Sequence, residues 1–225
     1  NELKNIISQV KEEKINGINV TVPFKKIVIP FLDDLTPEAK ITQSVNTIYF
    51  QNGITIGHNT DIAGFELAIK YAKYDISNKK VFVLGAGGVA PSIIYALKKM
   101  RASKIILTNR TKEKAENLKN LFNDIKIVDW GETIDFDMII NATSIGLKNE
   151  DSLKFDYSAN GPNKFFFDVI YNPKETLFLK RAKLFGNRVE NGKMMFIYQA
   201  HQAFTIWHEL MPQINDETIK LLDQW

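Results

Sequence analysis

The sequence contains no cysteine. This absence excludes disulfide bonds, zinc sites built from thiolates and a cysteine nucleophile, although it does not by itself identify a cellular compartment. Long hydrophobic runs are also missing, because the longest ones, such as "FFFDVI" and "VFVL", are far too short to cross a membrane. There is no internal repeat and no low-complexity segment. We therefore expect a globular protein with no membrane partner.

The sequence also has little excess of one charge, since 29 Lys and Arg against 26 Asp and Glu give a formal net charge of +3. Stretches such as "KEEK" and "NRTKEKAENLKNL" mix both signs instead of forming a basic stripe. This pattern argues against nucleic-acid binding. A weakly basic protein of this kind suits a phosphorylated cofactor as well as a carboxylate substrate.

What is present is enough to build a core. The chain has 225 residues, of which 44% are hydrophobic and 24% charged. This length and composition favour one large domain or two small ones and argue against intrinsic disorder. Residue 1 is Asn and no charged-then-apolar signal segment follows it, so we expect a processed chain or a fragment.

The first third of the sequence mixes short helices and strands. Asn52-Gly53 lies between two runs rich in β-forming residues, which is typical of a hairpin with a type I′ turn. Thr36 followed by Pro37 is typical of a helix start, with the threonine as N-cap. The elements expected here are a helix over 3–13, a strand over 18–22, a helix over 36–41, a hairpin over 46–57 and a helix over 59–72.

From Lys80 onwards strands and helices alternate, which predicts βαβ units and a parallel sheet. The expected strands are "KVFVL", "KIILT", "KIVDW", "DMIINA" and "FFFDV", with helices over "VAPSIIYALKKM" and "KEKAENLKNLF". The last 34 residues look mostly helical, with no strand. We predict an α/β fold: a doubly wound, Rossmann-type parallel sheet over 62–191, and a smaller α/β domain made from both chain ends, 1–61 and 192–225.

A glycine-rich turn directly follows the first of these strands. It has the form G-x-G-x-x-A and precedes a helix, as in dinucleotide-binding proteins. Gly85 permits the tight turn, Gly87 lets the backbone approach a pyrophosphate, and Ala90 keeps the helix close to the strand. The turn comprises Gly85, Ala86, Gly87, Gly88, Val89 and Ala90.

The end of the next strand indicates which dinucleotide binds. An NAD site would normally carry Asp or Glu there, whereas this chain has Asn109, Arg110 and Thr111, with Lys112 and Lys114 close behind. The planar guanidinium of an arginine can bind a 2′-phosphate through two hydrogen bonds. The alternative is that these basic residues are only a solvated helix start. We favour NADP over NAD.

Polar residues outside this segment are candidates for the chemistry. They are Lys25 after the first strand, Asn46 at the start of the hairpin, and Asn59, Thr60 and Asp61 at a helix start. Each has a plain structural alternative: a surface lysine, a turn residue and an N-cap. Their joint occurrence in one pattern favours a function.

Eight segments in this order and at these spacings resemble the shikimate dehydrogenases, from about Gly17 to the C-terminus. They are "NVTVPFK", "VNT", "NTD" followed by Gly64, "GAGG", "NRT", "NATSIG", "DVIYNP" and "GKMMFIYQA". The resemblance implies reversible NADP-dependent reduction of 3-dehydroshikimate to shikimate, on the route to aromatic amino acids, in a cytoplasmic enzyme. It also implies that Lys25 is catalytic and that Asp61 is its partner carboxylate.

The remaining roles also come from the resemblance. The substrate-binding residues are expected to be Thr21, Asn46, Asp61, Tyr171 and Gln199. Besides the glycine turn, the cofactor-binding residues are expected to be Asn109, Arg110, Thr111, Lys114, Thr143, Val169 and Gly192. Reduction of a ketone needs a proton donor beside the developing alkoxide, and Lys25 can be that donor. None of His58, His201 and His208 is expected to be catalytic, and no metal site is implied.

The resemblance fails at the beginning of the chain. Family members start with a strand and a Ser-x-Ser loop that binds the substrate carboxylate, whereas Ser8 lies in a helix-like run. We expect about 40 residues of a typical member to be absent, which would impair carboxylate binding. Two alternatives stay open: an NAD-preferring quinate/shikimate dehydrogenase, and a noncatalytic dinucleotide-binding module. Trp225 and the aromatic-rich last helices are compatible with a monomer or a homodimer.

Overall fold

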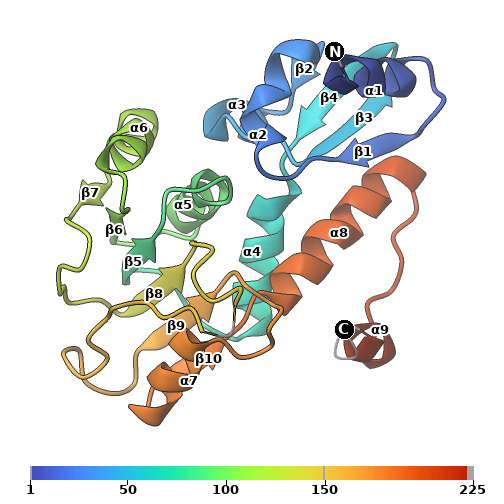
Figure 1. Ribbon diagram of the computed structural model, residues 1–225. Coiled ribbons are helices and arrows are strands. Elements are labelled where there is room, and N and C mark those ends of the chain that lie inside the picture. Colours follow the sequence, from blue (N-terminus) through green and yellow to red (C-terminus); the bar gives the residue numbers. More distant parts are fainter. Residues whose placement is uncertain (1, 149, 222–225) are drawn as a thin grey trace.

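The larger of two sheets is built as the alternating pattern predicts. The computed structural model describes residues 2–148 and 150–221, and this sheet has the strand order β10-β9-β8-β5-β6-β7, with every neighbouring pair parallel. Its place below the smaller sheet is seen in Figure 1. The strands are β5 (Lys80–Leu84), β6 (Lys104–Thr108), β7 (Lys126–Ile127), β8 (Met138–Asn141), β9 (Phe165–Asp168) and β10 (Arg188–Glu190).

Both faces of this sheet are covered, as buried parallel strands require. Val81 and Val83 of β5 face a core shared with four helices, while Phe82 and Leu84 face the opposite core. The four helices are α4 (Thr60–Tyr71), α5 (Ala90–Lys99), α6 (Lys112–Phe122) and α8 (Lys193–His208). The opposite face packs against α7 (Leu177–Leu184) and the segment 153–157. The α/β fold class is confirmed.

The smaller sheet is mixed and has the strand order β1-β3-β4-β2. Its hairpin turns at Asn52 and Gly53, whose φ angles of 52° and 84° are those of the expected turn. Val10, Val28, Ala39, Val45 and Ile48 belong to the core beneath it. The elements are α1 (Glu2–Lys11), β1 (Gly17–Asn19), α2 (Phe24–Ile27), a 3₁₀ turn (Ile29–Phe31), β2 (Asp34–Leu35), α3 (Pro37–Thr42), β3 (Thr47–Gln51) and β4 (Ile54–His58).

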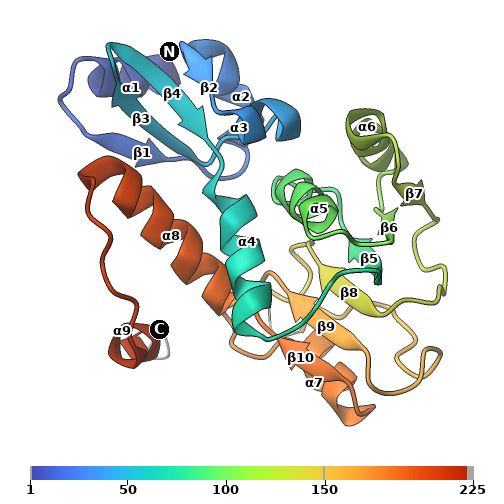
Figure 2. The same ribbon diagram turned by 180° about the vertical axis from the view of Figure 1, so that it is seen from behind.

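Helices α4 and α8 lie side by side between the two sheets (Figures 1 and 2). Their close approach depends on Gly64, because an added Cβ there would lie 2.9 Å from the backbone oxygen of Met195 and from Cβ of Gln199. At the far end of α8, the indole nitrogen of Trp207 donates a hydrogen bond of 3.1 Å to the backbone oxygen of Ile48 in β3. The helix pair therefore joins the sheets. The short α9 (Asp216–Leu221) follows α8.

Several expected elements have different bounds. The strand expected over 18–22 ends at Asn19, because the chain turns there and Phe24 N donates to Thr21 O. The strand expected over "KIVDW" ends at Ile127. β2, β10 and α7 were not predicted at all. Strands of two or three residues show no period in the sequence, so only tertiary pairing defines them.

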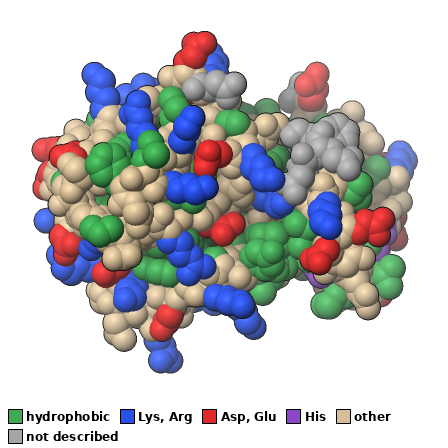
Figure 3. Space-filling model, turned by 90° about the horizontal axis from the view of Figure 1, so that it is seen from below, with side chains coloured by type: hydrophobic (Ala, Val, Ile, Leu, Met, Phe, Trp, Pro, Cys, Tyr) green, Lys and Arg blue, Asp and Glu red, His purple; other side chains and the backbone are tan. Residues whose placement is uncertain are grey.

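Charged side chains of both signs are interspersed on the face seen in Figure 3. None of the helices in the described part of the chain combines the length and the apolar character needed to cross a membrane. Within residues 2–148 and 150–221, no group of His, Asp and Glu side chains is placed to hold a metal ion. Trp225 lies outside the described residues, and the domain boundaries stay a prediction.

Candidate active site

The centre of the site is an ion pair between two predicted residues. Lys25 lies in the short helix α2, and its Nζ is 2.5 Å from Oδ2 of Asp61 in the first turn of α4. The side chains are only 13% and 9% exposed, so this pair is largely shielded from water. The neighbouring Lys26 is exposed. The alternative of Lys25 as an ordinary surface lysine does not fit this position.

Asp61 is not the N-cap of α4, so its carboxylate is available for other contacts. The N-cap of α4 is Asn59, whose side-chain oxygen accepts a hydrogen bond of 3.2 Å from Asp61 N. The second carboxylate oxygen of Asp61 accepts a hydrogen bond of 2.9 Å from Nδ2 of Asn46. Asn46 is fixed in turn, because its own oxygen accepts 2.8 Å from Thr60 N. The amide therefore orients the carboxylate toward Lys25.

Asn59 also links the start of α4 to α5 and to the segment before β3. Its Nδ2 donates hydrogen bonds of 2.9 Å to Oγ of Ser92 in α5 and to the backbone oxygen of Ser44. Asn59 and Ser92 are buried, so neither bond competes with water. A further bond of 3.5 Å runs from Ser44 Oγ to Gly88 O. The start of α4 is thus held against the glycine turn at the start of α5.

One cavity of about 420 Å³ has this ion pair in its wall. Tyr171 and Phe196 stack beside each other in the wall, with ring centroids 4.5 Å apart. The Nε2 of Gln199 donates 3.1 Å to Phe196 O. All the predicted substrate-binding residues face this space. It is lined by Asn19, Val20, Thr21, Lys25, Asn46, Asp61, Val89, Val169, Tyr171, Gly192, Met195, Phe196 and Gln199.

A second cavity, of about 640 Å³, extends over the carboxyl edge of the larger sheet. It shares Lys25, Val89, Val169 and Tyr171 with the first, so the two cavities adjoin at Lys25. Most of the predicted cofactor-binding residues line it: Gly85, Ala86, Gly87, Gly88, Val89, Asn109, Arg110, Thr111, Lys114, Thr143 and Val169. Ala90 is instead fully buried in the first turn of α5, and Gly192 lines the first cavity.

The glycine turn leaves room for a ligand where a side chain would close it. Gly85 has φ of +102°, and an added Cβ would lie 2.8 Å from Cγ2 of Thr143. Gly87 is exposed, and an added Cβ there has only Ala142 O within 4 Å, at 3.7 Å. The side-chain oxygen of Asn109 accepts 2.9 Å from Ala86 N and holds the turn in place. The backbone of Gly87 is therefore open to the cavity.

A buried polar network supports the part of the second cavity's wall that Thr143, Val169 and Ile170 form. Asp168 is fully buried at the end of β9, and its carboxylate accepts hydrogen bonds from Thr176 Oγ1 (2.7 Å), Ile170 N (3.0 Å) and Asn141 Nδ2 (3.0 Å). The oxygen of Asn141 accepts 2.7 Å from Oγ1 of Thr143. Burial raises the pKa of Asp168 to about 6, against the lowering effect of these bonds. The network fixes the loops over 141–145 and 168–172 relative to each other.

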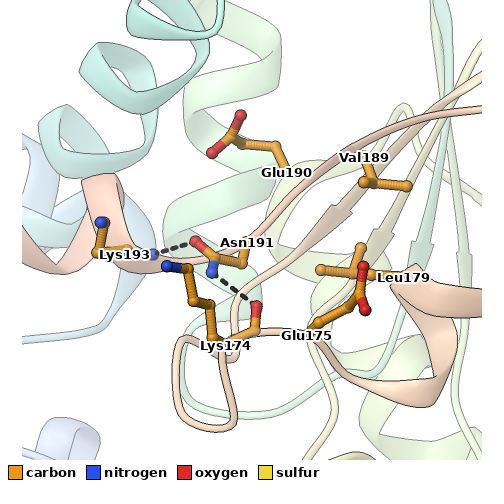
Figure 4. Close-up of a pocket in the computed structure, with 7 residues that line it drawn as sticks. All are labelled: Lys174, Glu175, Leu179, Val189, Glu190, Asn191 and Lys193. Carbon is orange, nitrogen blue, oxygen red and sulfur yellow. Dashed lines mark hydrogen bonds between the residues drawn. The ribbon is translucent and has the colours of Figure 1, made fainter. Parts of the chain in front are cut away.

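Gly192 has no room for a side chain. An added Cβ would overlap Val169 O and lie 2.6 Å from the carbonyl carbon of Val169. The preceding residue, Asn191, makes two hydrogen bonds (Figure 4). Its side chain donates one of 2.8 Å to Lys174 O and accepts one of 3.1 Å from Lys193 N. The start of α8 is therefore clamped to the loop that follows β9. The separate cavity of about 450 Å³ seen there is lined by Lys174, Glu175, Leu179, Val189, Glu190, Asn191 and Lys193.

Some residues of the site were missed, and two of the candidates named from the sequence, Asn59 and Thr60, line neither cavity. Val22, Trp130 and Leu147 line the second cavity, although none was predicted to bind a ligand. His58 lines neither cavity. Its Nδ1 is 2.9 Å from Oγ1 of Thr36, and burial lowers its pKa.

Two family models match the chain. The shikimate dehydrogenase substrate binding domain matches residues 1–48, and shikimate / quinate 5-dehydrogenase matches residues 66–174. A shikimate dehydrogenase (NADP(+)) of Pelagibacter ubique (strain HTCC1062) is 58% identical over 222 residues, which are 99% of this chain and 84% of that protein.

Solved structures agree with these matches. A shikimate dehydrogenase in complex with NADP+ is 34% identical, with a TM-score of 0.89 over 98% of this chain and 79% of that one. The enzyme of Thermus thermophilus, in complex with NADP(H) and shikimate, is 28% identical, with a TM-score of 0.87 over 99% and 83% of the two chains. Sequence identity, family models and fold agree that this chain belongs to the shikimate dehydrogenase family.

Proposed function

We propose that this protein is an NADP-dependent shikimate dehydrogenase, which reduces 3-dehydroshikimate to shikimate and runs in reverse. The observation that supports this most is the Lys25–Asp61 ion pair, because Lys25 lines both cavities and Asp61 holds it from the wall of the first. A proton-transferring group between a nucleotide site and a small polar cavity is what a ketone reductase needs.

The second cavity fits an NADP molecule. The exposed backbone of Gly87 and the start of α5 suit a pyrophosphate, because main-chain N–H groups at a helix start attract anions. Arg110, Thr111 and Lys114 line the same cavity after β6, where a 2′-phosphate on the ribose would need cationic partners. When bound, NADPH supplies the hydride that reduces the ketone. Val169, which lines both cavities, would contact it on the substrate side.

Lys25 would supply the proton. As hydride reaches the carbonyl carbon, negative charge develops on the oxygen, and the Lys25 ammonium can donate its proton there. In the oxidative direction, the neutral amine accepts the hydroxyl proton of shikimate. Asp61 holds the amine in place, because its carboxylate lies 2.5 Å from the amine nitrogen. Asp61 thus positions the donor and can also accept a substrate hydroxyl.

Neutral polar groups would bind the remaining hydroxyls. Asn46, Thr21, Tyr171 and Gln199 lie around the first cavity and carry amide or hydroxyl groups. Such groups bind uncharged hydroxyls without the cost of burying another charge. We further propose that 1–61 with 192–225 forms the substrate-binding domain and 62–191 the nucleotide-binding domain.

The test follows the absorbance of reduced cofactor with shikimate and either NADP+ or NAD+. Lys25→Met should lower kcat by about 10²- to 10⁴-fold, the range for removal of a general acid–base group, with little effect on the Kd for NADP+. Lys26→Met is the matched control and should keep the wild-type kcat, since Lys26 is exposed. Wild-type kcat in Lys25→Met would refute the proton-transfer role.

The cofactor and the substrate each need a separate comparison. Arg110→Ala should weaken NADP+ much more than NAD+, because only NADP+ carries the 2′-phosphate. An equal loss with both cofactors would contradict the 2′-phosphate assignment. Turnover of quinate faster than shikimate would favour a quinate/shikimate enzyme, and NADP+ binding without turnover of either would favour a noncatalytic module.

A further inference from the structure

Trp130 has a position that its sequence context did not reveal. It lies just after β7, is 37% exposed, and lines the same cavity as the glycine turn. β7 is parallel to β6, with Leu107 opposite Ile127, so the loops that follow both strands leave the same edge of the sheet. An ion pair of 3.9 Å between Lys112 Nζ and Asp129 Oδ1 links these loops.

The order of the strands matches the order of the groups in a dinucleotide. β5, β6 and β7 are neighbours, and each is followed at the carboxyl edge by a segment that lines the cavity. The glycine turn follows β5 and suits the pyrophosphate, and Arg110 follows β6 and suits the 2′-phosphorylated ribose. The next group outward is the adenine base. Neighbouring strands are about 4.8 Å apart, so the base would lie over the end of β7, where Trp130 is.

The chemistry of this end of the cavity is also that of a nucleotide base. An indole offers a flat apolar face on which a purine can stack, and stacking needs no hydrogen bond. A single exposed aromatic side chain is common on protein surfaces. Trp130 differs because it shares its cavity with Arg110, Thr111 and Lys114, which suit phosphate. We propose that Trp130 is the stacking surface for the adenine base of the cofactor, an inference that rests on the proposed dinucleotide site.

This role predicts that substitutions of Trp130 and of Arg110 affect different sets of ligands. Adenine is common to NAD+ and NADP+, so loss of the stacking face should weaken both by the same factor. Loss of Arg110 should weaken the ligands that carry a 2′-phosphate much more than NAD+. Alanine substitution of a stacking side chain typically weakens binding by about fivefold or more. We expect about a fivefold to tenfold rise in Kd in Trp130→Ala because Trp130 is partly exposed.

Binding can be measured without turnover. The probes are NADP+, NAD+ and 2′,5′-ADP, which has the adenosine and the 2′-phosphate but no nicotinamide. Titration calorimetry should give Trp130→Ala the same fold-increase in Kd for all three, and Trp130→Phe an increase of less than about threefold, because a smaller aromatic face remains. Saturation with 2′,5′-ADP should quench the tryptophan fluorescence of the wild type, and this quenching should vanish in Trp130→Phe. Thermal unfolding of both variants is measured alongside, so that a loss of folded protein is not mistaken for weaker binding.

Three results would overturn the inference: an unchanged Kd in Trp130→Ala, quenching that persists in Trp130→Phe, or an effect confined to 2′-phosphorylated probes. In each case the wild type would still bind NADP+, so the proposed function would stand. A wild type that binds none of the probes would overturn the cofactor assignment and this inference together.

Discussion

Replacing Gly192 with alanine should lower the activity of the enzyme strongly, through steric overlap alone. Gly192 has φ of −75° and ψ of 0°, a backbone conformation that alanine adopts without strain. The added Cβ, however, would overlap Val169 O and lie 2.6 Å from the carbonyl carbon of Val169. That is about 1 Å inside the optimal separation of two carbon atoms. Either the loop over 168–172 or the start of α8 must therefore move by a comparable distance.

Such a shift would act where the two cavities meet. Val169 and Tyr171 line both cavities, and Gly192 N donates 3.1 Å to Ile170 O between them. A displacement of about 1 Å in the relative position of reacting groups can lower a rate by about 10²-fold. Overpacking of this kind also costs about 1–3 kcal/mol of folding free energy. We expect Gly192→Ala to fold, with kcat for shikimate oxidation lowered by about 10²-fold.

The assay compares kcat and KM for shikimate and NADP+ with the free energy of unfolding in urea. Gly53→Ala is the control, because Gly53 lies in the hairpin turn with φ of +84° and nothing within 4 Å of an added Cβ. It should lose about 1 kcal/mol through backbone strain and keep the wild-type kcat. If Gly192→Ala also kept the wild-type kcat, the contact with Val169 would not control the reaction geometry.

Two other predictions concern buried polar groups. The pKa of Asp168 is raised to about 6, above the value of about 4 in an unfolded chain. Its contribution to stability is therefore complete below about pH 4 and is lost as the pH rises through 6. Relative to Asp168→Asn, the wild type should lose up to about 3 kcal/mol of unfolding free energy between pH 4 and 7; a difference independent of pH in urea titrations would contradict this. Ser92→Ala removes the 2.9 Å bond to Asn59 and should cost about 1–3 kcal/mol and lower kcat severalfold. The exposed Ser103→Ala is its control, and equal behaviour of the two variants would argue against coupling through Ser92.

Local signals in the sequence predicted part of this structure. The glycine turn follows a buried strand and precedes a helix, so residues that are neighbours in the sequence are enough to predict it. Asn59 and Ser92, by contrast, are 33 positions apart, and no local pattern indicates that their side chains meet. Trp130 was missed for a related reason. It was placed inside an expected strand, whereas β7 ends at Ile127, and only pairing with β6 determines where such a short strand stops.

The placement of the ionisable groups also has a consequence for how the reaction is controlled. Lys25 and Asp61 both precede the larger sheet in the chain, while the glycine turn and Arg110 directly follow two of its strands. The proposed proton donor and the proposed dinucleotide site are therefore held together by packing of α4 against α8 and by the bond between Asn59 and Ser92. Transfer of hydride and proton to the same carbonyl group needs the donor and the dinucleotide at a fixed separation. Substitutions in these contacts should consequently lower kcat more than they raise the Kd of either ligand.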